Sequence, residues 1–75
     1  MMKLITITIN GKPISVANTQ RIDYATAIRL AGKEVQPGLT VTYRTDNSQG
    51  SLLPGILGIC PDNTLIINVA DTSNA

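Results

Sequence analysis

The sequence contains no histidine, and this absence limits the chemistry that the chain can perform. Histidine is the commonest general base in enzymes and the usual partner of serine and cysteine nucleophiles. The five carboxylates are scattered along the chain. No glycine-rich phosphate loop and no spaced set of metal ligands is present. We therefore expect a protein that is not an enzyme and that uses no cofactor and no metal.

The chain has a single cysteine, Cys60, which excludes an internal disulfide. A small core that forms without a covalent staple is typical of proteins in a reducing cytoplasm. The thiol has two readings, a reactive group or a small core hydrophobe. A reactive thiol needs a cation nearby, whereas the neighbours here are Ile59 and Pro61. The pattern therefore favours an inert cysteine packed in the core.

Long apolar runs and blocks of like charge are also missing. The net charge is +1, with no basic patch that would indicate binding to nucleic acid or to an acidic membrane. A signal peptide needs a continuous apolar stretch, and a membrane span needs about 20 such residues. Neither is found in the sequence. We expect a cytoplasmic protein with no nucleic-acid or membrane partner.

What the sequence does contain is a 43% share of hydrophobic residues within 75 positions. That proportion is too high for a disordered chain, and the length is enough for one small domain. The apolar pattern stops at residue 69, and the last six residues are small and polar. We therefore predict a domain over residues 1–69 and a tail over residues 70–75.

The first strands are the clearest feature of the pattern. Residues 3–9 alternate isoleucine with threonine, as in a strand with one buried face. Asn10-Gly11 follows at once, and these two residues best tolerate the positive φ angles of a type I′ hairpin turn. The turn predicts a register that places apolar residues opposite apolar residues. The expected pairs are Ile5 with Val16 and Ile7 with Ile14.

A helix and further strands follow. Asp23 can cap a helix whose apolar face continues to residue 31, and Gly32 suits the left-handed position after its end. The remaining strands are expected at residues 39–44, 51–53 and 64–69. The first and last strands are the most apolar, so we expect them to pair in the centre. This order predicts an α+β fold of the ubiquitin-like β-grasp type, with one helix on a mixed sheet of four to five strands.

Five segments resemble the bacterial multiubiquitin domain, and they occur in the family's order over nearly the whole chain. They are residues 7–13 (ITINGKP), 22–32 (IDYATAIRLAG), 41–44 (VTYR), 50–55 (GSLLPG) and 67–69 (INV). Members of this family have a ubiquitin-like fold. They occur, alone or in tandem, in bacterial operons that encode ubiquitin-activating-like, conjugating-like and protease-like enzymes, some of them linked to antiphage defence.

The resemblance implies a protein modifier whose C-terminal carboxylate is adenylated, passed to a carrier residue and joined to a target amine. In this sequence the conjugation terminus would be Ala75. The tail that enters the partner enzymes would comprise Asp71, Thr72, Ser73 and Asn74. Ubiquitin and most relatives end in Gly-Gly, which suits a narrow channel because glycine has no side chain. The enzyme channel would here have to accept asparagine and alanine, or another end would react.

The resemblance also points to a partner interface, because ubiquitin binds its partners on the outer face of its sheet. The residues expected there are Thr42, Arg44, Ile66 and Asn68. Two other functions stay open. One is a β-grasp module that scaffolds its operon partners without being conjugated, using Arg44 and Ile66. The other is a sulfur carrier, which shares the fold and normally needs the terminal Gly-Gly.

Overall fold

A computed structural model describes residues 3–71 of the chain. The described part contains five β-strands and one α-helix. In chain order they are β1 (Leu4–Ile9), β2 (Lys12–Ala17), α1 (Tyr24–Leu30), β3 (Leu39–Arg44), β4 (Gln49–Leu52) and β5 (Ile66–Asp71).

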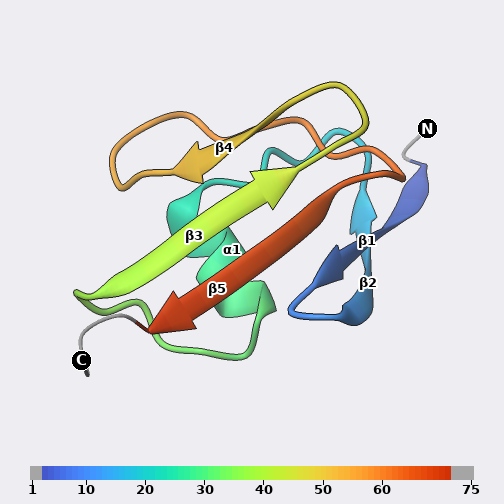
Figure 1. Ribbon diagram of the computed structural model, residues 1–75. Coiled ribbons are helices and arrows are strands. Elements are labelled where there is room, and N and C mark those ends of the chain that lie inside the picture. The colour runs from blue at the N-terminus through green and yellow to red at the C-terminus, as the bar shows by residue number, and fades with distance from the viewer. Residues whose placement is uncertain (1–2, 72–75) are drawn as a thin grey trace.

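The strands form one mixed sheet in the order β2-β1-β5-β3-β4. Strand β1 pairs with β5 in parallel, and the other neighbouring strands are antiparallel. Figure 1 shows β5 between β3 and β1, with α1 behind the sheet. The predicted central pairing of the first and last strands is confirmed. This strand order with one helix is the ubiquitin-like β-grasp fold of the α+β class.

The first hairpin has the predicted register. Ile5 faces Val16, and Ile7 faces Ile14. The turn residues Asn10 and Gly11 have φ angles of 51° and 80°. Both values lie in the left-handed region that a type I′ turn requires, so the predicted turn and register of the β1–β2 hairpin are confirmed.

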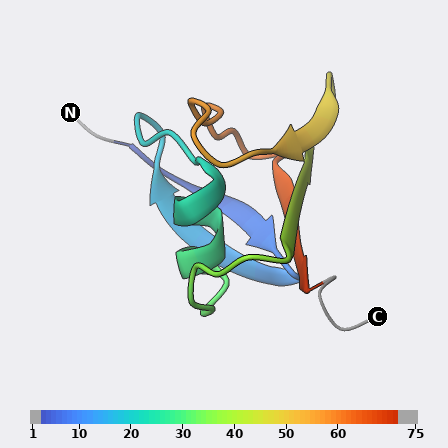
Figure 2. The ribbon, with the colours of Figure 1, turned by 90° about the vertical axis from the view of Figure 1, so that its left-hand side faces the viewer.

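The helix begins and ends as its sequence indicates. The Asp23 carboxylate accepts a hydrogen bond from the Thr26 backbone amide at 2.8 Å, which caps the first turn. After the helix, Gly32 has a φ of +80°. Figure 2 shows α1 lying across one face of the curved sheet, between the β1–β2 hairpin and the β3–β5 pair. It buries Ala27 and Ile28 against that face.

The core is aliphatic and lies between α1 and the inner face of the sheet. Its buried side chains come from every strand, from α1, and from the segments that precede α1 and β5. The largest fully buried ones are Ile7, Ile9, Ile22, Ile28, Val41, Leu65 and Ile67. Tyr24 packs beside them, and its hydroxyl donates a 2.8 Å hydrogen bond to the Leu39 carbonyl. The ring therefore contributes apolar area while its polar end is satisfied.

Several strand boundaries differ from the prediction. Strand β4 begins at Gln49, two residues earlier than predicted, because Gln49 and Gly50 pair with the end of β3, and it ends at Leu52, one residue earlier. The connecting loop is closed by a 2.7 Å hydrogen bond from the Thr45 amide to the Ser48 carbonyl. Strand β5 begins at Ile66, two residues later than predicted, because Leu65 belongs to the turn held by Asp62.

Strand β5 also ends two residues later than predicted. Ala70 and Asp71 were assigned to the tail, but they lie opposite Thr40 and Leu39 in the ladder with β3. Because these residues are small or polar, they continue no alternation of apolar residues that would predict a strand. Here the strand is extended by backbone pairing with β3. Residues 72–75 of the predicted tail lie outside the described residues.

Asn10 has a second role that leads to a testable expectation. Its side-chain oxygen accepts a 2.8 Å hydrogen bond from the Val69 amide, which continues the β1–β5 pairing beyond the last residue of β1. Replacing Asn10 with glycine keeps the turn conformation but removes this acceptor. We expect a loss of about 1 kcal/mol in the free energy of unfolding, measured in urea.

Aspartate is the matched control at this position, because it tolerates the left-handed conformation and keeps an acceptor oxygen. The Asn10→Asp variant should therefore unfold close to the wild type. Equal stability of the glycine variant and the wild type would contradict a stabilising role for the Asn10 side chain.

Candidate functional site

The four residues predicted for a partner interface lie together on the outer face of the sheet, opposite the helix. Thr42 pairs with Asn68, and Arg44 pairs with Ile66, so the four occupy adjacent positions on β3 and β5. They line a hollow of about 450 Å³, which we call the outer-face hollow. Its other lining residues are Tyr43, Gln49, Gly50 and Ser51.

The chemistry of the outer-face hollow suits binding. Arg44 is exposed and is the only charged residue in the lining. Ile66 is half-buried beside it, and the other polar groups are amides and hydroxyls. An arginine can bind a carboxylate or a carbonyl through several N–H groups, and the isoleucine offers apolar contact. The lining therefore contains groups for recognition and no acid–base pair.

Strand β5 joins this hollow to the C-terminal part of the chain. Ile66 and Asn68 line the hollow, and Asp71 is the last residue of the strand. Three residues of strand span about 10 Å. Asp71 was expected in a tail that enters partner enzymes, and the structure places it in the sheet. The other expected tail residues, Thr72, Ser73, Asn74 and the terminal Ala75, lie outside the described residues.

Cys60 does not occupy the core position predicted for it. Its side chain is exposed. The cysteine lies between the half-buried Ile59 and the buried Pro61. Backbone hydrogen bonds in both directions hold Ile59 against Ile22, at 2.8 and 2.9 Å. In this extended segment neighbouring side chains alternate, so anchoring Ile59 toward the core turns the thiol to solvent.

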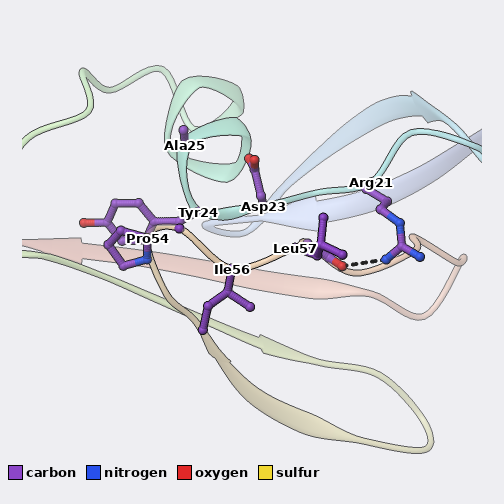
Figure 3. Close-up of a pocket in the computed structure, with 9 residues that line it drawn as sticks. Arg21, Asp23, Tyr24, Ala25, Pro54, Ile56 and Leu57 are labelled. Atoms are coloured by element: carbon purple, nitrogen blue, oxygen red, sulfur yellow. Dashed lines mark hydrogen bonds between the residues drawn. The ribbon is translucent and has the colours of Figure 1, made fainter.

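A second hollow was not predicted from the sequence. It lies between the start of α1 and the connection from β4 to β5, has a volume of about 370 Å³, and is called here the helix–loop hollow. Its lining residues are Arg21, Asp23, Tyr24, Ala25, Pro54, Gly55, Ile56, Leu57 and Gly58. Figure 3 shows Tyr24 and Pro54 at one end and Arg21 at the other.

The loop side of this hollow is fixed to the segment before the helix. Arg21 donates a 2.8 Å hydrogen bond from Nη1 to the Gly58 carbonyl, drawn as a dashed line in Figure 3. The next residue of each segment, Ile22 and Ile59, forms an isolated antiparallel β-bridge. Leu53, Ile56 and Leu57 lie in a segment without strand pairing, and these apolar residues were the one sequence signal of this feature.

Two carboxyl groups near the loops, those of Asp23 and Asp62, have lowered pKa values. The hydrogen bonds from the Thr26 side chain and backbone amide hold the pKa of Asp23 below its ordinary value of 3.8. The hydrogen bonds from Thr64 lower the pKa of Asp62 in the same way. Asp62 Oδ1 accepts a 2.8 Å hydrogen bond from the Thr64 amide and a 2.6 Å hydrogen bond from the Thr64 hydroxyl. Both carboxylates therefore act as structural acceptors at neutral pH.

The lowered pKa of Asp23 predicts a loss of stability in acid. A carboxyl group whose pKa is lower in the folded state stabilises the fold above its unfolded-state pKa and loses that contribution as the pH falls through the folded value. The melting temperature should therefore fall once the pH drops below about 4, near the ordinary pKa of the carboxyl group. Thermal unfolding followed by circular dichroism at several pH values measures this.

Replacing Asp23 with asparagine distinguishes the effect of helix capping from the effect of the carboxylate charge, because asparagine caps helices as well as aspartate and does not titrate. The Asp23→Asn variant should match the wild type near neutral pH and lose less stability in acid. Parallel acid profiles for the two proteins would show that Asp23 does not contribute to the pH dependence.

Among residues 3–71, no group of three or more histidine, cysteine, aspartate or glutamate side chains gathers where a metal ion could be held. No helix in this part of the chain is long and apolar enough to cross a membrane. The absence of a cofactor, a metal and an enzymatic activity stays a prediction, as does the cytoplasmic location.

The described residues thus define a small ubiquitin-like β-grasp domain, with the outer-face hollow on β3, β4 and β5 and the helix–loop hollow between α1 and the β4–β5 connection. Comparisons with known protein families, with curated proteins and with solved structures found no match. The fold class therefore rests on the strand order and the helix, and the resemblance to multiubiquitin domains remains a prediction.

Proposed function

We propose that this protein is a ubiquitin-like modifier of a bacterial conjugation system of the kind linked to antiphage defence. Partner activating-like and conjugating-like enzymes would join its C-terminal carboxylate to target proteins, and a protease would process it. The observation that carries the proposal is the course of β5. This strand lines the outer-face hollow with Ile66 and Asn68 and then leads to the C-terminal residues.

A partner bound in the outer-face hollow would lie close to the chain that it has to act on. Ile66 would take its apolar contact, and Arg44 would bind an acidic or carbonyl group. From Asn68 to Ala75 there are seven residues, which span at most about 25 Å when fully extended. That reach is sufficient for the carboxylate to enter the active site of a partner that holds the hollow.

The chemistry would be supplied by the partner enzyme. The carboxylate of Ala75 attacks the α-phosphate of ATP, which forms an acyl-adenylate and releases pyrophosphate. A nucleophile on the enzyme then takes the acyl group and releases AMP, and a target amine takes it in turn. In this sequence of steps the modifier contributes its carboxylate and its binding surface.

The decisive experiment compares the chain ending at Ala75 with a chain ending at Asp71. Each is incubated with the activating enzyme of its operon and ATP, and intact-mass analysis detects the adenylate and the enzyme-linked form. The longer chain should form both species. The shorter chain should form neither, because its terminus is part of β5 and lies opposite Leu39. Both chains should fold, as judged by circular dichroism.

Cys60→Ala is the control for this experiment. The modifier provides a carboxylate and the enzyme provides the nucleophile, so the alanine variant should form adducts like the wild type. Adducts on the chain ending at Asp71 would overturn the proposal. The scaffold function would then take its place, since it uses Arg44 and Ile66 and needs no reactive terminus.

A further inference from the structure

Three exposed apolar side chains lie on the connection between β4 and β5, two of them lining the helix–loop hollow, and together they are called the apolar ledge. It consists of Leu53, Ile56 and Leu57, whose side chains are 53%, 57% and 81% exposed. These are three of the five large hydrophobic side chains that are exposed within residues 3–71. Scattered exposed apolar residues are normal on protein surfaces, but a cluster beside a hollow commonly marks an interaction site.

The hollow next to the ledge is held in a fixed shape. Tyr24 forms one wall, and its hydroxyl is bound to the Leu39 carbonyl. Gly58 forms the opposite wall and packs directly against the backbone of Ile22 and Asp23. A surface that is already ordered binds more tightly, because little conformational entropy is lost when a partner docks.

Arg21 is an exposed cation at one end of the hollow, whose lining also includes the carboxylate of Asp23. The cation that acts on the neighbouring Asp23 carboxylate is Arg29, and that carboxylate is also engaged by Thr26. Within the described residues, the Arg21 guanidinium makes one hydrogen bond, to the Gly58 carbonyl. A guanidinium has five N–H donors, so the exposed Arg21 side chain has further donors for a partner group. An apolar surface with a cation at its end is complementary to an apolar segment that carries a carboxylate.

We propose that the apolar ledge and the helix–loop hollow form a docking site for a short peptide segment of a partner protein. The segment places one or two large aliphatic side chains over Ile56 and Leu57 and an aspartate or glutamate against Arg21. This site is separate from the outer-face hollow and does not depend on conjugation. It would serve equally in a modifier and in a scaffold.

The test uses a phage-displayed library of random peptides, selected on the wild-type protein and counter-selected on the Leu57→Ser variant. Leu57 is highly exposed, so the serine variant should keep the wild-type melting temperature. Enriched peptides should combine large aliphatic residues with a nearby acid. The affinity of synthetic copies for the Leu57→Ser variant should be lower by about tenfold, since the lost apolar contact is that of one leucine.

Two controls make the result specific. Leu4→Ser changes another exposed leucine, 69% exposed at the start of β1, and should leave binding unchanged. The charge is tested on the peptide, because Arg21 also holds the loop. Changing the acid of a selected peptide to its amide should weaken binding several-fold.

Three results would overturn the proposal. One is a library without enrichment for the wild type over the Leu57→Ser variant. Another is equal binding of the acidic and amide peptides. The third is concentration-dependent dimerisation of the wild type that Leu57→Ser abolishes in sedimentation experiments, which would assign the ledge to a second copy of the chain.

Discussion

Replacing Gly58 with alanine is expected to destabilise the fold by about 3 kcal/mol or more, at the upper end of overpacking effects. A Cβ atom at this position would overlap the Ile22 carbonyl group and lie 2.5 Å from the Asp23 amide nitrogen. Both neighbours are backbone, so no side-chain rotation can relieve the overlap. The same backbone carries the bridge to Ile59 and the helix cap, and both would have to move.

The scale of this loss matters because the domain is small. At the usual stability per residue, a chain of this length has about 4–11 kcal/mol in total. The Gly58→Ala variant should therefore show a large fall in the midpoint of urea unfolding and in melting temperature. Increased proteolysis of the connection between β4 and β5 should accompany it, because this connection loses its anchor.

The Gly55→Ala variant is a control that distinguishes the effect of steric overlap on stability from the effect of an unfavourable backbone conformation. Gly55 has a φ of +81° and nothing within 4 Å of an added Cβ, so its alanine variant has conformational strain without overlap. That strain amounts to about 1–2 kcal/mol. If Gly58→Ala were no more destabilising than Gly55→Ala, the close approach of Gly58 to the helix segment would not be a constraint on the fold.

Ile67→Ala should have an effect of similar size for a different reason. Ile67 is fully buried in the central strand, between Ile9 on β1 and Tyr43 on β3. Truncating a buried isoleucine to alanine removes apolar contacts and leaves a cavity, which together amount to about 2–5 kcal/mol. Urea unfolding followed by tyrosine fluorescence and circular dichroism measures the change.

A graded series tests this explanation. Ile67→Val removes one methylene group and should lose about 0.5–1.5 kcal/mol. Leu57→Ala shortens an exposed side chain and should stay within about 0.5 kcal/mol of the wild type. A valine variant as unstable as the alanine variant would show that shape at this position matters more than buried volume.

Elements with strong local signals were predicted well from the sequence. Asn10 and Gly11 fix a turn conformation that few other residues adopt, and the turn fixes the hairpin register. Asp23 and Gly32 mark the limits of α1 through bonds within one helical turn. In the outer-face hollow, the alternation along β3 and β5 was enough to bring Arg44 and Ile66 to one face. In each case the determining contacts lie within a few residues or follow from the period of a strand.

The features that were missed depend on contacts between distant segments. Gln49 and Gly50 have little strand propensity, and they become strand because β3 offers a partner. Glycine fits at position 50 because the Tyr43 ring lies about 3.2 Å from where a Cβ would be. Cys60 faces solvent because Ile59 is bonded to Ile22. The helix–loop hollow exists because Arg21 and Gly58 meet across 37 residues of sequence. No local sequence pattern predicts these contacts between segments that are distant in the sequence.

The staggered pairing of β1 and β5 determines how the domain would respond to a pulling force. The two strands run in the same direction, and only the end of β1 overlaps the beginning of β5, at Thr8 and Ile9. A pull on the two chain ends therefore acts along the two strands in opposite directions, and the hydrogen bonds of the overlap bear the force together. The Asn10 side chain adds one hydrogen bond to this overlap, from the Val69 amide. Separation of β1 from β5 by such a pull requires these bonds to break together.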